Sequence, residues 1–256
     1  MYRLIMTMLM AIATVVQVAA QDTYRYKRHG EYKDDSQARW AIDAHIGGNA
    51  TIGAHRSGGN APLFRMGAAS QTGMLTSLHA EYYIPNSQWS VKAGYEHEEI
   101  SYLKGDANSD LNQLMAGGRW RPAPTDWWVQ PYVGADVLWA IDAGRDDLAS
   151  DITMPQEGYQ YHIGGQTRTP RFSAGPVLGA DVYIFSHIAL QAQYGFRLGF
   201  GSHNHAVYTD NKEATPTVYH GQIHRHVLSV GLKVDFPFHF TEGDSRGLLQ
   251  GILDSY

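Results

Sequence analysis

Strict alternation of apolar and polar side chains between residues 188 and 200 constrains the fold more than any other feature of this chain. Only apolar side chains occupy the even-numbered positions, whereas the odd-numbered ones are small or polar and include Gln191, Gln193 and Arg197. A period of two places the two sets on opposite faces of a strand. The run can cross a bilayer, because a tilted transmembrane strand needs about 9–11 residues. The pattern therefore indicates a strand with lipid on one face and a narrow, wet interior on the other.

Seven further segments alternate in the same way, which predicts eight strands in all. They are residues 37–48, 74–84, 89–96, 113–120, 127–141, 172–184 and 228–238. The connections after the second, fourth and sixth strands are short, whereas three of the others reach roughly twenty residues or more. In bacterial outer-membrane barrels the short turns are periplasmic and the long loops extracellular. The predicted fold is all-β, an eight-stranded antiparallel up-and-down transmembrane β-barrel over residues 37–240, with both termini in the periplasm.

Two details of these strands need an explanation. Pro131 and Pro176 lie inside the fifth and sixth strands, although proline cannot donate to a ladder and is normally confined to edges and bulges. We expect a bulge or a locally lost hydrogen bond at each. The alternation of the third strand decays at residues 97–99, where we expect that strand to leave the membrane.

The start of the chain predicts export. Arg3 gives a basic beginning, residues 4–16 are apolar, and residues 18–20 fit a small-residue cleavage signal, so residues 1–20 are interpreted as a signal peptide. Residues 21–36 are then a polar periplasmic lead-in. The chain has no Cys, which excludes disulfides and thiolate metal sites. Export without Cys fits a bacterial envelope protein, and the predicted location is the outer membrane. The mild net charge of −5 makes nucleic acid an unexpected partner.

Aromatic residues gather at the ends of the predicted strands. A first group lies at the short-turn end and comprises Trp40, Tyr82, Trp89, Trp120, Trp127, Phe236 and Phe238. Tyr95, Trp139, Phe172 and Phe200 lie toward the opposite end. Aromatic girdles mark both membrane interfaces of such barrels. The alternative is the aromatic core of a soluble barrel.

Charged residues are predicted to fill the interior, because eight strands leave room only for side chains. The predicted luminal network consists of Arg39, Asp43, Glu81, Lys92, Glu96, Arg119, Asp136, Asp181, Arg197, Lys233 and Asp235, with His45 and His79 among them. Buried charge is costly unless it is paired. The network is therefore either a salt-bridged plug or the lining of a narrow gated pore. A wide porin is not expected, since water-filled channels need about 16 strands.

The predicted signal peptide, eight alternating strands, aromatic girdle and loop alternation together resemble the small outer-membrane β-barrel family. That family includes the membrane domain of outer-membrane protein A and its porin-like relatives. The resemblance covers residues 37–240 and implies insertion by the barrel assembly machinery, with function in surface loops or periplasmic attachments. Such barrels commonly end on an aromatic residue, as at Phe238 or Phe240, but this chain continues to Tyr256. Residues 241–256 form either a short amphipathic periplasmic helix or a disordered end.

Histidines and serines supply two alternatives. His203, His205, His224 and His226 form two H-x-H pairs of a kind that ligates Zn or Cu, although the pattern is weak and solvated loop histidines are the favoured explanation. An enzyme acting on lipid A would need a nucleophile and base, for which Ser173 or Ser202 with His203 or His205 are the candidates. No spacing singles them out, so no enzyme, no catalytic residue and no cofactor are predicted.

The leading hypothesis is a non-catalytic barrel with a structural or partner-binding role. Its partners would be outer-membrane lipid and a protein bound through the extracellular loops or the tail, as in an accessory subunit of an outer-membrane assembly. A narrow gated pore, a lipid A-modifying enzyme and a loop metal-binding protein are the alternatives. Loop sequence identifies no ligand, because loops vary freely on such scaffolds.

Overall fold

The computed structural model describes residues 40–58, 72–85, 87–102, 107–122, 128–154, 159–185, 187–210 and 215–236. The predicted signal peptide, the lead-in, the C-terminal tail and Arg39, Trp127, Phe238 and Phe240 lie outside these residues. Within the described part of the chain, no helix is long and apolar enough to cross a bilayer.

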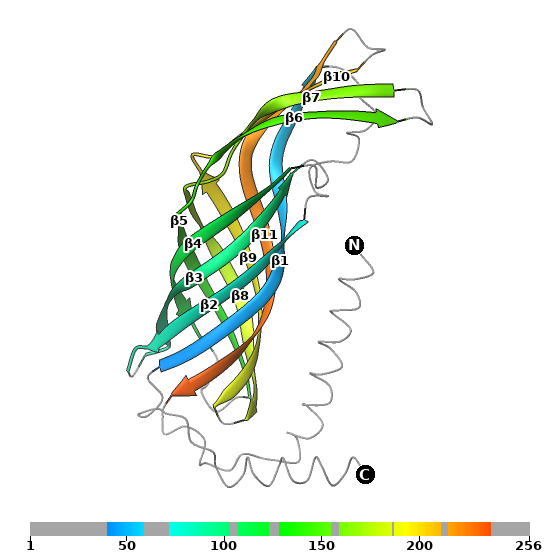
Figure 1. Ribbon diagram of the computed structural model, residues 1–256. Coiled ribbons are helices and arrows are strands. Elements are labelled where there is room, and N and C mark those ends of the chain that lie inside the picture. Colours follow the sequence, from blue (N-terminus) through cyan, green and yellow to red (C-terminus); the bar gives the residue numbers. More distant parts are fainter. Residues whose placement is uncertain are drawn as a thin grey trace, which may run out of the picture.

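Eight long strands form the wall of a closed barrel (Figure 1). They are β1 (Trp40–Gly58), β2 (Thr72–Tyr83), β3 (Trp89–Tyr102), β4 (Ala107–Trp120), β5 (Val129–Ala140), β8 (Phe172–Phe185), β9 (Ile188–Phe200) and β11 (Thr217–Phe236). Every neighbouring pair is antiparallel, and the barrel closes because β1 pairs with both β2 and β11. At the closure, Trp40 lies opposite Tyr82 on one side and Phe236 on the other. The predicted eight-stranded antiparallel barrel is confirmed.

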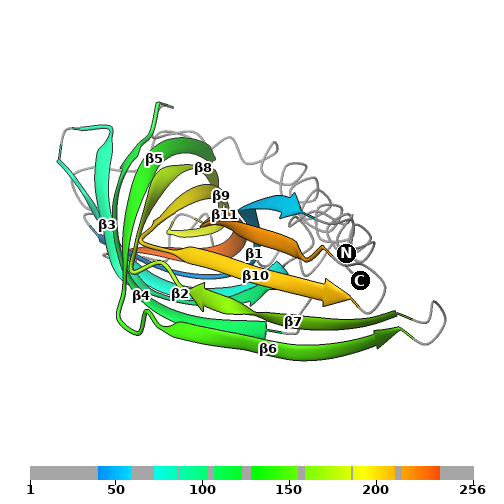
Figure 2. The ribbon, with the colours of Figure 1, turned by 90° about the horizontal axis from the view of Figure 1, so that it is seen from above.

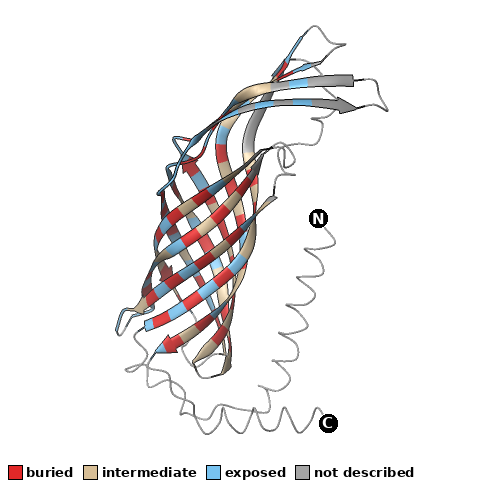
Figure 3. Cartoon of the chain, in the orientation of Figure 1, coloured by how far each residue is buried: buried red, intermediate tan, exposed pale blue. Residues whose placement is uncertain are grey.

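Alternating burial runs along the barrel strands, as Figure 3 shows. In β5 each residue from Gln130 to Ala140 changes burial relative to its neighbours, with Tyr132, Asp136 and Leu138 buried and Val137 and Trp139 exposed. Outward-facing residues such as Leu78 and Leu178 are more than half exposed. An apolar band of this extent on a closed surface is satisfied by lipid. The fold is that of a small outer-membrane β-barrel.

Aromatic side chains edge this band at both ends. At the short-turn end Trp40, Trp89 and Phe236 are exposed, and Tyr82 and Trp120 are partly exposed. Toward the opposite end Tyr95, Trp139, Phe172 and Phe200 are exposed. None of these nine side chains is packed in a dry interior, which disagrees with an aromatic core of a soluble barrel.

Three further strands, β6 (Arg145–Met154), β7 (Tyr159–Arg168) and β10 (His203–Asp210), extend the wall beyond one end of the barrel. They pair in the order β11-β10-β7-β6, and Figure 2 shows them side by side beyond the barrel mouth. We call β6, β7, β10 and residues 217–221 of β11 the rim sheet. These three segments were predicted to be loops, and that prediction is wrong. The third strand was predicted to end near residues 97–99, whereas β3 continues to Tyr102. The alternation of apolar and polar residues that marks the wall strands is weak in these segments, as in β10, HNHAVYTD.

The rim sheet continues the barrel strands past a shared bend. The chain leaves β5 at residues 141–144, re-enters β8 through residues 169–171 and leaves β9 at Gly201, whose φ is +69°. Hydrogen bonds fix this bend: Thr169 N donates to Gly144 O (3.1 Å), and Gly144 N donates to Thr169 Oγ1 (2.8 Å). Ser202 Oγ accepts from Ile223 N and donates to Gly199 O, both at 2.9 Å. The bend is therefore a bonded part of the fold.

The two strand prolines have different solutions. Pro131 pairs in register with Ala180 of β8. On its other side it has no strand partner, because the pairing of β5 with β4 ends at Trp120 and Val133. At Pro176 the β8–β9 pairing skips from Ala174 to Val177 without a change of register. The expected local loss of pairing occurs at Pro176, whereas Pro131 keeps its pairing with β8 and needs no bulge, because β4 has already ended on its other side.

Candidate functional site: the luminal charge network

The barrel interior holds nearly all of the predicted luminal charges. Period two directs alternate residues inward, and each charged position falls on that phase of its strand. All of the predicted network except Arg39 is at most 5% exposed, namely Asp43, Glu81, Lys92, Glu96, Arg119, Asp136, Asp181, Arg197, Lys233 and Asp235. With Glu98, Arg121 and Arg225, the described residues bury seven carboxylates and six cationic side chains. The interior is close to electrically neutral.

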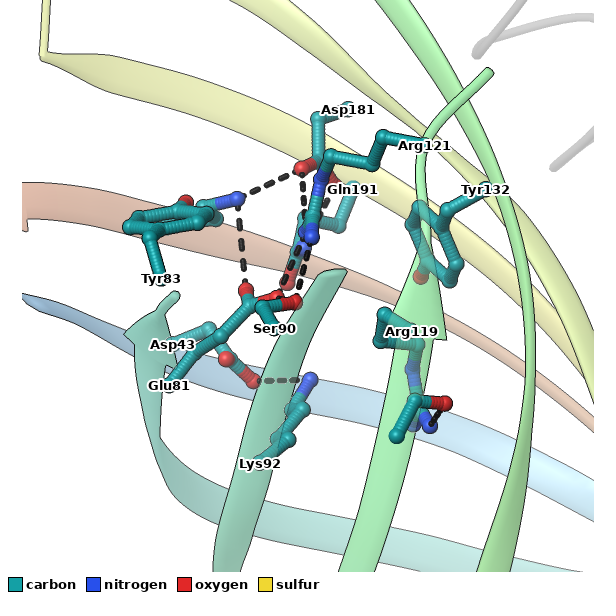
Figure 4. A network of polar contacts seen from close by, with 12 residues as sticks. Asp43, Glu81, Tyr83, Ser90, Lys92, Arg119, Arg121, Tyr132, Asp181 and Gln191 are labelled. Atoms are coloured by element: carbon teal, nitrogen blue, oxygen red, sulfur yellow. Dashed lines mark hydrogen bonds and ion pairs between the residues drawn. The ribbon is translucent and has the colours of Figure 1, made fainter. Parts of the chain in front are cut away.

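A four-charge cluster lies at the short-turn end of the lumen (Figure 4). Lys233 Nζ is 2.5 Å from Asp181 Oδ2 and 3.4 Å from Glu81 Oε2. Arg121 Nη2 is 2.7 Å from Glu81 Oε1 and 3.2 Å from Asp181 Oδ2. Ser90 donates to Glu81 and accepts from Arg121 Nη1 at 2.6 Å. Each cation thus joins both carboxylates, so four strands and the β4–β5 connection are tied across the lumen.

Tyrosines surround this cluster. Tyr83 and Tyr183 donate their hydroxyls to the two oxygens of Asp235, at 2.9 and 2.8 Å. Lys233 Nζ lies 5.0 Å from the centroid of the Tyr83 ring, and the Arg121 guanidinium lies 5.4 Å from that of Tyr132. Cation–π contacts of this kind strengthen when water is excluded. The aromatic rings therefore fill the space between strands while holding the cations.

Asp43 is the centre of a second cluster. Its Oδ1 lies 2.8 Å from Lys92 Nζ, 2.8 Å from His45 Nε2 and 2.9 Å from His79 Nδ1. His79 Nε2 is 3.2 Å from Glu96 Oε1. Asp43, His45 and His79 could offer one ligand atom each within 4.8 Å of one another. A divalent ion fits this set poorly, because the Lys92 ammonium already shares the same carboxylate oxygen.

A third cluster links the remaining charges toward the rim. Arg197 is 2.6 Å from Glu96 Oε2 and 3.1 Å from Glu98 Oε2, and Arg225 Nε is 2.9 Å from Glu98 Oε1. Arg119 makes two parallel contacts with Asp136, at 2.6 and 3.1 Å. Above these charges lies a small buried apolar group, Ile100, Leu111, Ala140 and Ile223. The network thus extends from the short turns to an apolar layer near the bend.

Sequence analysis missed Glu98, Arg121 and Arg225. Glu98 belongs to the segment where the third strand was expected to leave the membrane, yet β3 continues to Tyr102 and Glu98 is fully buried. Arg121 lies in the short connection predicted between residues 120 and 127, and Arg225 precedes the predicted start of the last strand at residue 228. Glu98 and Arg225 share the inward phase of Glu96 and Asp235 in their own strands. Continuing the alternation of inward and outward residues past the predicted strand ends would have identified both residues as luminal.

The four histidines predicted as metal ligands do not converge. The rings of His203 and His205 on β10 stack at 6.2 Å, whereas His226 lies 2.6 Å from the Tyr194 hydroxyl and His224 accepts from Gly199 N. No group of three ligands among the described residues includes any of them. The proposed nucleophiles are also occupied, since Arg225 donates to Ser173 Oγ (3.2 Å) and Ser202 Oγ binds backbone at the bend.

Comparison with known proteins adds similarity of fold. No protein-family model and no curated protein sequence matches the chain. Neisserial surface protein A is 15% identical over 77% of this chain and 97% of its own, with a TM-score of 0.46. The N-terminal β-barrel domain of OprF from Pseudomonas aeruginosa is 12% identical over 77% and 99%, with a TM-score of 0.38. The outer-membrane protein OprG from the same organism is 15% identical over 79% and 98%, with a TM-score of 0.37. These matches concern architecture alone.

Proposed function

We propose that this protein is a non-catalytic barrel of the bacterial outer membrane that holds a rim sheet outside the bilayer for binding. In this proposal the lumen is a salt-bridged plug. Both termini are periplasmic, residues 1–20 are removed on export, and the barrel assembly machinery inserts the chain. The long connections and the rim sheet then face the exterior. The protein's function lies in what the rim sheet or the C-terminal tail binds, including a partner in a larger outer-membrane assembly.

The burial and pairing of the luminal charges carry this proposal. A conducting pore needs a continuous wet path, yet in the described lumen Asp181, Glu81 and Lys233 are at most 1% exposed. Their contacts cross the barrel, so a passing solute would have to break several of them together. Removing one partner of a buried pair costs about 3–5 kcal/mol. We infer that a network of this kind blocks the passage of ions through the lumen.

Planar-bilayer recording tests the plug. The folded full chain should show no unitary conductance, whereas the double variant Arg119→Ala with Asp136→Ala should leak because it removes a buried ion pair, whose guanidinium lies 5.8 Å from the centroid of the Tyr132 ring, from the lumen. A matched control is Arg145→Ala with Asp147→Ala, which deletes the same charges on the exposed rim sheet and should remain silent. Steady conductance by the unmodified protein would contradict the plug.

One observation favours a narrow gated pore as second candidate. Several buried polar atoms, including Asp43 Oδ2, Arg119 Nε and Arg121 Nε, have no hydrogen-bond partner among the described residues. Such atoms in native proteins usually bind ordered water, and a chain of waters would be a start for conduction. The pore predicts brief openings in the unmodified protein whose size changes in Arg119→Ala.

A further inference from the structure

Three basic side chains stand in one row across the rim sheet. Arg145 of β6 lies opposite Arg168 of β7, and Arg168 lies opposite His203 of β10. Directly opposed residues share a face of the sheet and have Cβ atoms about 4.5–5.5 Å apart. Like charges at such positions destabilise a sheet. The row therefore calls for an explanation other than strand pairing.

Among the described residues, one weak ion pair reaches this row. Arg145 Nε is 4.0 Å from Asp147 Oδ1, and both side chains are more than 60% exposed, so that contact is weak. Among the described residues, no ion pair joins Arg168 or His203 to an acid. The cationic side chains of the lumen, in contrast, all lie close to carboxylates. The two arginines of the row, unlike the cations of the lumen, therefore have no buried carboxylate partner among the described residues, although β6 also carries Asp146, Asp147 and Asp151.

The row lines an open pocket of about 580 Å³. Its lining consists of Ala143, Gly144, Arg145, Gln166, Thr167, Arg168 and His203. Guanidinium groups carry only donors, and the imidazole and the Gln166 amide can each offer at least one. A donor set of this kind matches the oxygens of phosphate or carboxylate, with which arginine forms bidentate contacts. The pocket volume is larger than that of a single phosphate or carboxylate group and is within the usual range for small-ligand sites.

The floor of the pocket is held in place before any ligand binds. Gly144 and Thr169 exchange hydrogen bonds across the bend. These bonds hold the backbone next to Arg145 and Arg168 in place. The His203 ring is stacked parallel to that of His205, which limits its rotation. A site whose donors are positioned in advance loses less entropy on binding.

We propose that this pocket binds a phosphate or carboxylate group carried by a sugar-sized ligand. The same chemistry is available from an outer-leaflet lipid headgroup and from a free anionic sugar. The inference deepens the proposed function and rests on it for the rim sheet being outside the bilayer, but it is independent of a sealed lumen. Conduction by the unmodified protein would contradict the proposed plug but would not contradict this binding site.

Two binding measurements distinguish the sources. In the first, glucosamine 1-phosphate is titrated calorimetrically into the full chain folded in phosphatidylcholine nanodiscs. In the second, native mass spectrometry counts lipids retained from nanodiscs that also contain phosphatidylglycerol. Saturable binding in the first alone identifies a free ligand, and retained phosphatidylglycerol identifies a headgroup. Absence of both overturns the proposal.

Charge-matched variants test the location. Arg168→Gln should weaken binding at least about tenfold, as expected for loss of a charged hydrogen-bond donor, and His203→Gln should weaken it less. Arg171→Gln is the control, because Arg171 is an exposed arginine three residues away that does not line the pocket. Equal weakening by Arg168→Gln and Arg171→Gln would show general attraction of anions and overturn the site. Unchanged heat-modifiable mobility in gels shows that each variant is folded.

Discussion

Lys233 shows how much a single luminal side chain contributes. It is fully buried between Asp181 and Glu81, so Lys233→Met keeps most of its volume but leaves two carboxylates close together. Loss of one partner from a buried pair costs about 3–5 kcal/mol. Urea unfolding of the barrel in lipid vesicles should show a decrease of that size in the free energy of unfolding. Arg145→Met, at an exposed pair, should change it by about 1 kcal/mol or less. Similar small effects of both variants would show that the luminal pairs add little stability.

Two adjacent glycines of β4 provide a second test at the level of residues. A methyl group at Gly117 would overlap the Asp136 carboxylate and the Ala135 carbonyl, whereas one at Gly118 would meet nothing nearer than Ser90 O at 4.0 Å. Gly117→Ala should therefore displace Asp136 from Arg119 and lower the free energy of unfolding by about 1–3 kcal/mol, the usual cost of overpacking. Gly118→Ala should leave it nearly unchanged. Equal effects would contradict the position of Gly117 on the inward face of β4, beside Asp136 and Arg119.

At the level of elements, the bend divides the chain into a barrel and a separable rim. Barrel pairing between β5 and β8 ends at Trp139 and Phe172, and β6 and β7 pair only with each other and β10. Asp146 and Thr167 are direct partners, so an Asn-Gly turn can replace residues 147–166. The shortened chain should still fold, as measured by heat-modifiable mobility and a β-type circular dichroism spectrum.

A matched deletion inside the barrel checks this division. An Asn-Gly turn in place of residues 137–174 joins the partners Asp136 and Gly175 but removes part of the wall. That variant should fail to close, because a membrane barrel has no tolerated open edge. If both deletions fold alike, or both fail, the bend is not a boundary between independent elements.

The wall strands were predictable from sequence and the rim strands were not, for a physical reason. In the wall, lipid selects apolar residues on one face, so segments such as 188–200 alternate without exception. In the rim strands this contrast is weak, as in β10, HNHAVYTD, which agrees with the proposed place of the rim sheet outside the bilayer. Glu98 was missed for a related reason: a charge was taken as a sign of solvent, although in a narrow barrel a charge can be fully buried beside Arg197 and Arg225. Contacts across the lumen join strands far apart in sequence, and strand phase does not specify partners.

At the level of the whole molecule, the apolar band on the outer face of the barrel and the charges in its lumen require each other. A barrel in water would place its apolar residues inside and its charges outside, whereas here Leu178 is 54% exposed and Asp181, three residues later, is fully buried. An exterior of this kind is stable only where the surrounding medium is itself apolar. The inward charges in turn are stable because they pair with one another across the lumen, as Asp181 does with Lys233.

A charge placed on the exterior therefore tests the orientation of the entire fold. Leu178 lies near the middle of β8, and Leu178→Arg should lower the free energy of unfolding in vesicles by about 2–4 kcal/mol, the cost of arginine at the bilayer midplane. Ile141→Arg, at a similarly exposed apolar site just past the end of β5 (64% against 54% for Leu178), should cost about 0–1 kcal/mol, because arginine near the interface remains hydrated. In a water-soluble barrel both substitutions would be nearly neutral, since exposed positions tolerate charge. A depth-dependent penalty identifies lipid as the solvent of the outer face, and equal, small effects would contradict the transmembrane assignment on which the plug, the rim sheet and the anion pocket depend.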